Sequence, residues 1–130
     1  MKKVLLQWWP TAIVIVVILY ATLFPDPAGA DKLPAIPGID KLIHAIMFGG
    51  LAGAIAFDYT RLQPYYRISR GRMLAFCAIA ALAGGAIEIL QGIMHLGRGA
   101  DIYDFYADVA GTVVALFAAP PTIAAVHHRR

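Results

Sequence analysis

Residues 73–96 read MLAFCAIAALAGGAIEILQGIMHL, and this stretch decides the fold class. A helix that crosses the hydrocarbon core of a bilayer needs about 20 consecutive, mostly apolar residues. The stretch meets that length, has no lysine or arginine, and contains Glu88 as its only acidic residue. Residues 73–96 are therefore predicted to form a transmembrane helix that carries one carboxyl group inside the bilayer.

The composition of the whole chain agrees with a membrane protein. The 130 residues are 60% hydrophobic and 15% charged, and the mean hydropathy is +0.68. A soluble domain carries roughly 25% charged residues. This composition therefore excludes an ordinary soluble domain, and it also excludes disordered, collagen-like and coiled-coil chains. The bilayer is expected to act as the solvent for most of the chain.

Three further apolar stretches complete the predicted fold. They cover about residues 4–24, 39–59 and 105–126. Together with residues 73–96 they predict an all-α membrane protein, with one domain over residues 1–130 that folds as a four-helix transmembrane bundle. Small residues such as Ala45, Gly49 and Gly111 are expected where the helices pack, because lipid provides no hydrophobic force between helices.

The N-terminus also has features of a secretory signal. Met1-Lys2-Lys3 precedes the first apolar run, and Ala28-Gly29-Ala30 resembles a small-residue cleavage site. The apolar run is longer than the 7–15 residues typical of a signal core, so a retained first helix is the preferred interpretation. Cleavage would leave three helices, and this alternative stays open.

Basic residues predict the orientation of the bundle, because lysine and arginine near the spans stay on the cytoplasmic side. In a four-span chain, most of them fall on one side: Lys2, Lys3, Arg61, Arg67, Arg70, Arg72, Arg129 and Arg130. The others fall on the opposite side: Lys32, Lys41 and Arg98. Both termini are therefore predicted to be cytoplasmic. This topology explains the net charge of +3, and no nucleic-acid partner is expected, since no basic groove or aromatic platform accompanies it.

Ionisable and amide side chains gather at the predicted outer end of the last three spans. A charged group at the bilayer centre costs about 2.5–3.5 kcal/mol, so such groups usually face the bundle interior and mark function. Glu88 lies about 22 Å along the helix from Met73, in the outer third of a core about 30 Å thick. The candidate acid–base residues are Glu88 and His44. The candidate ligand-binding residues are Asp40, Lys41, Gln91, Arg98, Asp101, Asp104 and Asp108.

The same residues leave the metal and cofactor content open. Carboxylates with an imidazole can hold a divalent cation through oxygen and nitrogen ligands. The chain has no metal motif of fixed spacing, however, and its single Cys77 excludes an intrachain disulfide. The metal, any cofactor and enzymatic activity itself are therefore unknown at this level.

Short motifs in three predicted spans resemble one known family. Asp40-Lys41-x-x-His44, Glu88-x-x-Gln91 and Arg98-Gly-Ala-Asp-Ile-Tyr-Asp104, followed by Gly111, resemble the signature of VanZ-like membrane proteins over about residues 15–118. Asp108 departs from the family pattern, which usually has asparagine there. The resemblance implies a multi-pass protein of the bacterial cytoplasmic (inner) membrane. The family is named for resistance to the glycopeptide teicoplanin, and the resemblance implies a contribution to such resistance but no particular reaction.

These observations predict a polar site at the outer leaflet that recognises or modifies an envelope molecule. The molecule would be a lipid, a lipid-linked cell-wall precursor or a glycopeptide. Lys41 and Arg98 would hold an anionic group, and Glu88 or His44 would act as an acid or base. Two alternatives stay open: a non-catalytic scaffold with a structural polar knot, and a proton or cation transporter. The expected partners are the lipid bilayer and an anionic lipid or precursor, and an oligomer is compatible with the sequence.

Overall fold

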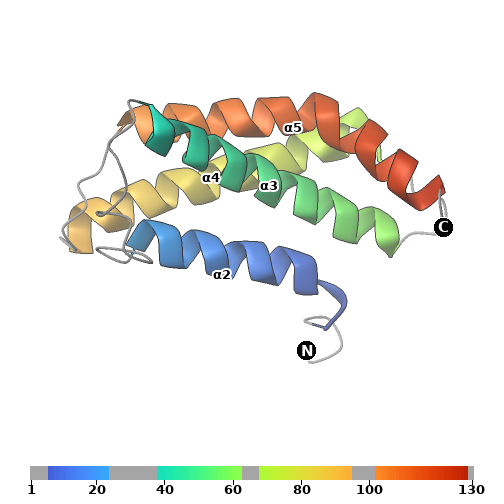
Figure 1. Ribbon diagram of the computed structural model, residues 1–130, viewed down its shortest axis with the longest axis horizontal. Helices are drawn as coiled ribbons and strands as arrows, with labels where there is room; N and C mark the ends of the chain where they lie inside the picture. Colours follow the sequence, from blue (N-terminus) through green and yellow to red (C-terminus); the bar gives the residue numbers. More distant parts are fainter. Residues whose placement is uncertain (1–5, 24–37, 63–67, 95–101, 129–130) are drawn as a thin grey trace.

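The computed structural model describes residues 6–23, 38–62, 68–94 and 102–128, and every regular element in these residues is a helix. The four helices are α2 (Trp9–Leu23), α3 (Ile39–Arg61), α4 (Arg70–Met94) and α5 (Ile102–His128). They run in alternating directions along one long axis (Figure 1). The predicted all-α architecture is therefore confirmed.

Three of the helices are long and apolar enough to cross a membrane. They are the segments Lys41–Arg61, Arg70–Met94 and Ile102–Ala125. Large apolar side chains on their outer surfaces support this assignment, since Leu82 and Phe117 are each 73% exposed, as expected for groups that face lipid. α2 is also apolar, but its 15 residues extend about 22 Å. The fourth crossing and the orientation of the termini stay predictions.

The helices begin and end close to the predicted boundaries, and local hydrogen bonding explains one difference. α4 begins at Arg70, three residues before the predicted start of the span at 73. The Ser69 hydroxyl accepts a hydrogen bond from the Arg72 backbone N–H at 3.2 Å, so Ser69 acts as the N-cap. α5 continues through Pro120 and Pro121 as far as His128.

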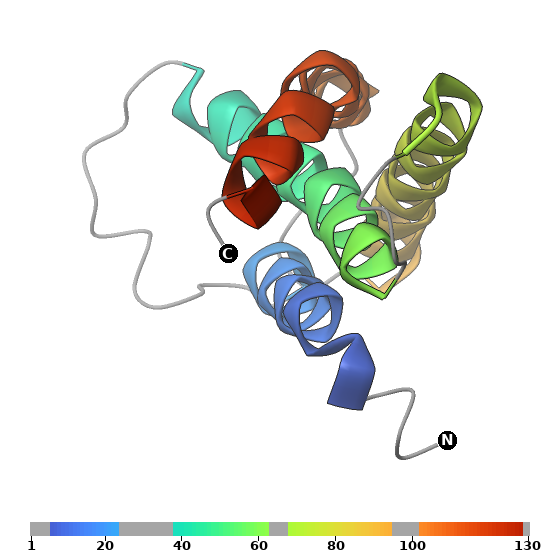
Figure 2. The same ribbon diagram turned by 90° about the vertical axis from the view of Figure 1, so that its right-hand side faces the viewer.

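α3 is the central helix and packs against α2, α4 and α5 (Figure 2). Its most extensive contact is with α5, where the two backbones touch at small residues. A Cβ atom added at Gly49 would lie 2.7 Å from the Gly111 carbonyl oxygen, and one added at Gly111 would overlap the Ala45 carbonyl group. The predicted packing at Ala45, Gly49 and Gly111 is confirmed, and it fixes how α3 faces α5.

Candidate functional site

His44 lies in the second turn of α3, and its side chain is 3% exposed. Its Nδ1 atom is 2.8 Å from Oδ1 of Asp108, and its Nε2 atom is 3.5 Å from Oδ2 of Asp104. Asp104 and Asp108 are four residues apart on α5 and therefore share one face of that helix. Both ring nitrogens of His44 thus face carboxylates of α5. The ring of Phe48 stacks against the imidazole, with the two ring centroids 6.2 Å apart.

Lys41 lies one turn before His44 and reaches the same carboxylate pair. Its Nζ atom is 2.5 Å from Oδ1 of Asp104, and the side chains of Lys41 and Asp104 are 33% and 13% exposed. Asp104 therefore lies between the partly exposed side chain of Lys41 and the buried imidazole of His44. This ion pair is the part of the site nearest to the surface.

Glu88 brings α4 into the site. The ligand atoms of Glu88, His44 and Asp108 all lie within 4.8 Å of one another, and all three residues are buried. Gly84, one turn before Glu88, makes the approach possible, because a Cβ atom there would lie 2.5 Å from Oδ2 of Asp108. We refer to Lys41, His44, Glu88, Asp104 and Asp108 as the His44 cluster. It joins three helices at the end of the bundle where α3 and α5 begin and α4 ends.

Gln91 lies one turn beyond Glu88 and has a structural contact. Its Nε2 atom donates a hydrogen bond of 2.6 Å to the carbonyl oxygen of Thr22. Carbonyl groups in the last turn of a helix have no partner within that helix, and Gln91 satisfies the one at Thr22 in α2. The Oε1 atom of Gln91 is buried and has no hydrogen-bond partner among the described residues.

The structure brings together most of the residues predicted to form the site. Lys41, His44, Glu88, Asp104 and Asp108 meet, and Gln91 lies beside them. The side chain of Asp40, and the whole of Arg98 and Asp101, lie outside the described residues. Their predicted roles stay predictions.

No family model, curated protein or solved structure matches this chain. The resemblance to VanZ-like proteins therefore rests on the quoted motifs alone and stays a prediction.

The His44 cluster carries an excess of negative charge. Among its described side chains, one ammonium group faces three carboxylates, so the net charge is −2 when His44 is neutral. Like charges at this separation repel strongly where the dielectric constant is low. A proton on the imidazole or a bound cation would relieve this repulsion, so the cluster is suited to hold protons or a metal ion.

A further buried carboxylate, Asp58, lies at the opposite end of α3 and was not singled out as a site by the sequence. Its Oδ2 atom accepts hydrogen bonds from the backbone N–H of Thr11 at 3.0 Å and from the Thr11 hydroxyl at 2.6 Å. Its Oδ1 atom is 3.1 Å from Nη2 of Arg61, which also donates to the Gln7 carbonyl oxygen. Asp58 thus caps the first turn of α2 from a neighbouring helix. The sequence signal that could have indicated this contact was Thr11, a polar residue within an apolar run.

Proposed function

We propose that this chain is a VanZ-like, multi-pass protein of the bacterial cytoplasmic membrane that recognises or modifies an envelope amphiphile at its outer leaflet. Its polar headgroup would meet the His44 cluster, and both termini would be cytoplasmic. The amphiphile would be a lipid or a lipid-linked cell-wall precursor, with teicoplanin resistance as one expected phenotype. The observation that carries the proposal is the convergence of buried ionisable groups from three helices at one end of the bundle.

Packing alone gives no reason for the cluster. The small residues at the α3–α5 contact already allow close approach of the two helices, which is how helices associate in lipid. Buried charges add a desolvation cost, and apolar residues of similar volume often stabilise a protein as well or better. A polar cluster kept inside apolar spans is therefore best explained by chemistry.

The contacts suggest a division of roles within the cluster. His44 is oriented by Asp108 through Nδ1, and its Nε2 atom faces Asp104, so its ring is held in position to transfer a proton. Lys41 is the least buried of the cluster's side chains, at 33% exposed. It can exchange its contact with Asp104 for one with a phosphate or carboxylate of an incoming headgroup.

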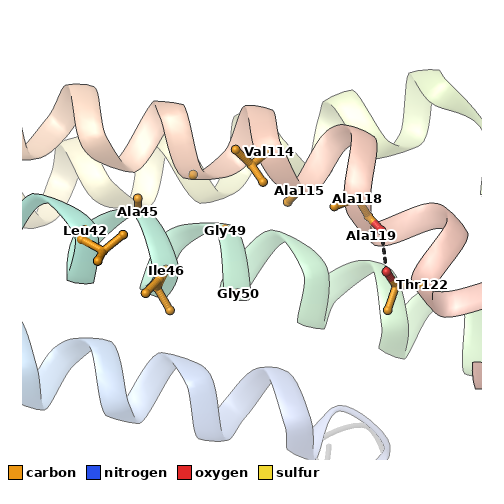
Figure 3. Close-up of a pocket in the computed structure, with 11 residues that line it drawn as sticks. Leu42, Ala45, Ile46, Gly49, Gly50, Val114, Ala115, Ala118, Ala119 and Thr122 are labelled. Carbon is orange, nitrogen blue, oxygen red and sulfur yellow. Dashed lines mark hydrogen bonds between the residues drawn. The ribbon is translucent and has the colours of Figure 1, made fainter.

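An apolar groove between α3 and α5, the two helices that carry Lys41 and Asp104, offers a place for an acyl chain. The groove has a volume of about 410 Å³ and lies between α3 and α5, where it is lined by Leu42 and Ile46 of α3, by Val114 and Ala118 of α5, and by glycine and alanine residues of both helices (Figure 3). It starts at Leu42, directly after Lys41 in the sequence. Pockets of this size hold small-molecule ligands in many proteins. An acyl chain in the groove would hold the headgroup next to Lys41.

The proposal is tested by lipid retention in detergent. Purified protein is mixed with fluorescent phosphatidylglycerol or phosphatidylcholine, and the retained label is measured after size exclusion. We expect preferential retention of the anionic lipid, and at least a tenfold loss of affinity in Gly50→Leu. Gly50 lines the groove, and a Cβ atom there has no neighbour within 4 Å, so the leucine would fill the groove without a backbone clash.

Gly71→Leu is the matched control, because its Cβ atom also meets nothing within 4 Å and Gly71 lies at the start of α4, away from the groove. It should retain lipid as the parent protein does. The proposal would be contradicted if the parent protein retained the two lipids equally and if Gly50→Leu retained as much lipid as the parent protein.

A further inference from the structure

We infer that His44, Glu88 and Asp108 bind one divalent transition-metal ion. The three side chains come from three different helices, are all buried, and place one ligand atom each within 4.8 Å of the others. Metal–ligand distances of about 2.0–2.2 Å require the ligand atoms to approach one another slightly more closely. Small rotations about the side-chain bonds of Glu88 and Asp108 provide that movement. The inference goes beyond the proposed function, because it would hold whatever the envelope ligand is, and with the metal bound His44 would act as a ligand and not as the residue that transfers a proton.

A second observation at the same place also points to a ligand. Oδ2 of Asp108 is buried and has no hydrogen-bond partner among the described residues, although the Asp108 side chain is only 1% exposed. This oxygen lies against Gly84, one turn from Glu88 on α4. Buried polar atoms in native proteins are nearly always satisfied by protein, water or an ion. A metal ion between Asp108 and Glu88 would satisfy it.

The charge of the described side chains fits a divalent cation. With a neutral imidazole, as metal binding requires, the His44 cluster has a net charge of −2 (Lys41 against Glu88, Asp104 and Asp108). A divalent ion would bring this sum to zero. The added positive charge would lower the cost of keeping three carboxylates in a low-dielectric environment.

The surroundings of His44 are those of a metal ligand. Coordination through Nδ1, on the side of Asp108, would leave the Nε2–H group to donate to Asp104, 3.5 Å away. Metal-binding histidines usually donate their second N–H to a carboxylate, which fixes the ring orientation. Asp104 is itself held by Lys41 at 2.5 Å. Lys41 and Asp104 would therefore position His44 without taking part in coordination themselves.

The donor atoms indicate the kind of metal. One imidazole and two carboxylates suit Zn²⁺ or Mn²⁺, whereas all-oxygen sites suit Mg²⁺ and Ca²⁺, and soft thiolate sites suit copper(I). Cys77 is directed elsewhere, because its Sγ atom donates to the Thr112 carbonyl oxygen at 3.1 Å. We therefore expect Zn²⁺ and Mn²⁺ to bind more tightly than Mg²⁺ or Ca²⁺.

Titration calorimetry of chelator-treated protein in detergent tests the inference, with His127 and His128 replaced by alanine in every sample so that they supply no ligand. We expect about one Zn²⁺ or Mn²⁺ per chain. Glu88→Gln and Asp108→Asn should each weaken binding at least tenfold, as loss of a ligand carboxylate would. Asp58→Asn, at the other buried carboxylate, should bind as the parent protein does.

Co²⁺ provides a second readout that does not depend on the folding of the variants. The parent protein should give the visible absorption of a low-symmetry nitrogen–oxygen site, and Zn²⁺ should displace it. Absence of Zn²⁺, Mn²⁺ and Co²⁺ binding by monodisperse parent protein would overturn the inference. Binding at parental affinity in both Glu88→Gln and Asp108→Asn would also overturn it. Neither result would decide the lipid-retention test, because that test measures lipid binding and not metal binding.

Discussion

Nδ1 of His44 and Oδ1 of Asp108 lie 2.8 Å apart, and this buried contact joins α3 to α5. The contact forms next to Ala45 and Gly111, where the backbones of α3 and α5 come close together, so neither side chain has to extend far. The pair is the centre of the His44 cluster, and its removal should affect stability and chemistry in different ways.

We expect His44→Ala to lower the free energy of unfolding by about 3–5 kcal/mol, because it leaves two buried carboxylates without their shared partner. Asp108→Asn keeps a side chain that can bond to His44, and it should cost about 1 kcal/mol. Chemical denaturation in detergent, followed by circular dichroism, measures both. Equal losses in the two variants would argue against a charge-assisted contact between His44 and Asp108.

The close approach of the α3 and α5 backbones predicts different effects on stability when alanine replaces Gly111 and when it replaces Gly50. Gly111→Ala should destabilise the protein by about 1–3 kcal/mol, because the added methyl group overlaps the Ala45 carbonyl and forces α3 and α5 apart. Gly50→Ala adds the same group where nothing lies within 4 Å. It should be neutral or stabilising by up to about 1 kcal/mol, since alanine favours helix. Thermal unfolding in one detergent compares them directly.

The contact between Asp58 and Thr11 should hold the start of α2 in place. Asp58→Ala removes the acceptor for the backbone N–H and the hydroxyl of Thr11, and we expect a loss of about 2–3 kcal/mol with faster proteolysis near α2. Thr122→Val is the control, because the Thr122 hydroxyl bonds only within its own helix, to the Ala118 carbonyl. It should change stability by less than about 0.5 kcal/mol. Similar proteolysis of the two variants would contradict this role for Asp58.

The predicted orientation can be tested by cysteine labelling in cells, in a Cys77→Ala background. Leu62 at the end of α3 and Ile102 at the start of α5 are both exposed and lie at opposite ends of the bundle. A membrane-impermeant maleimide should label Ile102→Cys in intact cells and Leu62→Cys only after permeabilisation, because the basic residues predict a cytoplasmic position for Leu62. The reverse pattern would invert the topology.

Much of the fold was predictable because helix and span signals are local. An apolar stretch such as residues 73–96 determines its own secondary structure, since a helix satisfies its backbone within one segment. The end of the bundle at which the site lies was predictable for the same reason: His44 and Asp104 lie in the first two turns of their helices, and Glu88 lies late in its own. Spacing also placed Asp104 and Asp108 on one face.

Contacts between helices were not predictable in the same way. The pairing of His44 with Asp108 depends on the side-by-side packing of α3 and α5, which small residues permit but do not specify. The contact between Thr11 and Asp58 joins residues 47 positions apart, and no local pattern relates them. Gln91 was expected to bind a ligand. Its hydrogen bond to Thr22 depends on the packing of α2 against α4, which the sequence pattern does not specify.

The two attachments of α2 have a mechanical consequence. α2 is held near its start by Asp58 of α3 and near its end by Gln91 of α4, and between these contacts the three helices line an apolar cavity of about 310 Å³. α2 is therefore hydrogen-bonded to α3 at one end and to α4 at the other. If α3 slid past α4, the hydrogen bonds of Asp58 or the hydrogen bond of Gln91 to α2 would have to break. α2 therefore limits how far the helices can separate at the end of the bundle that carries His44.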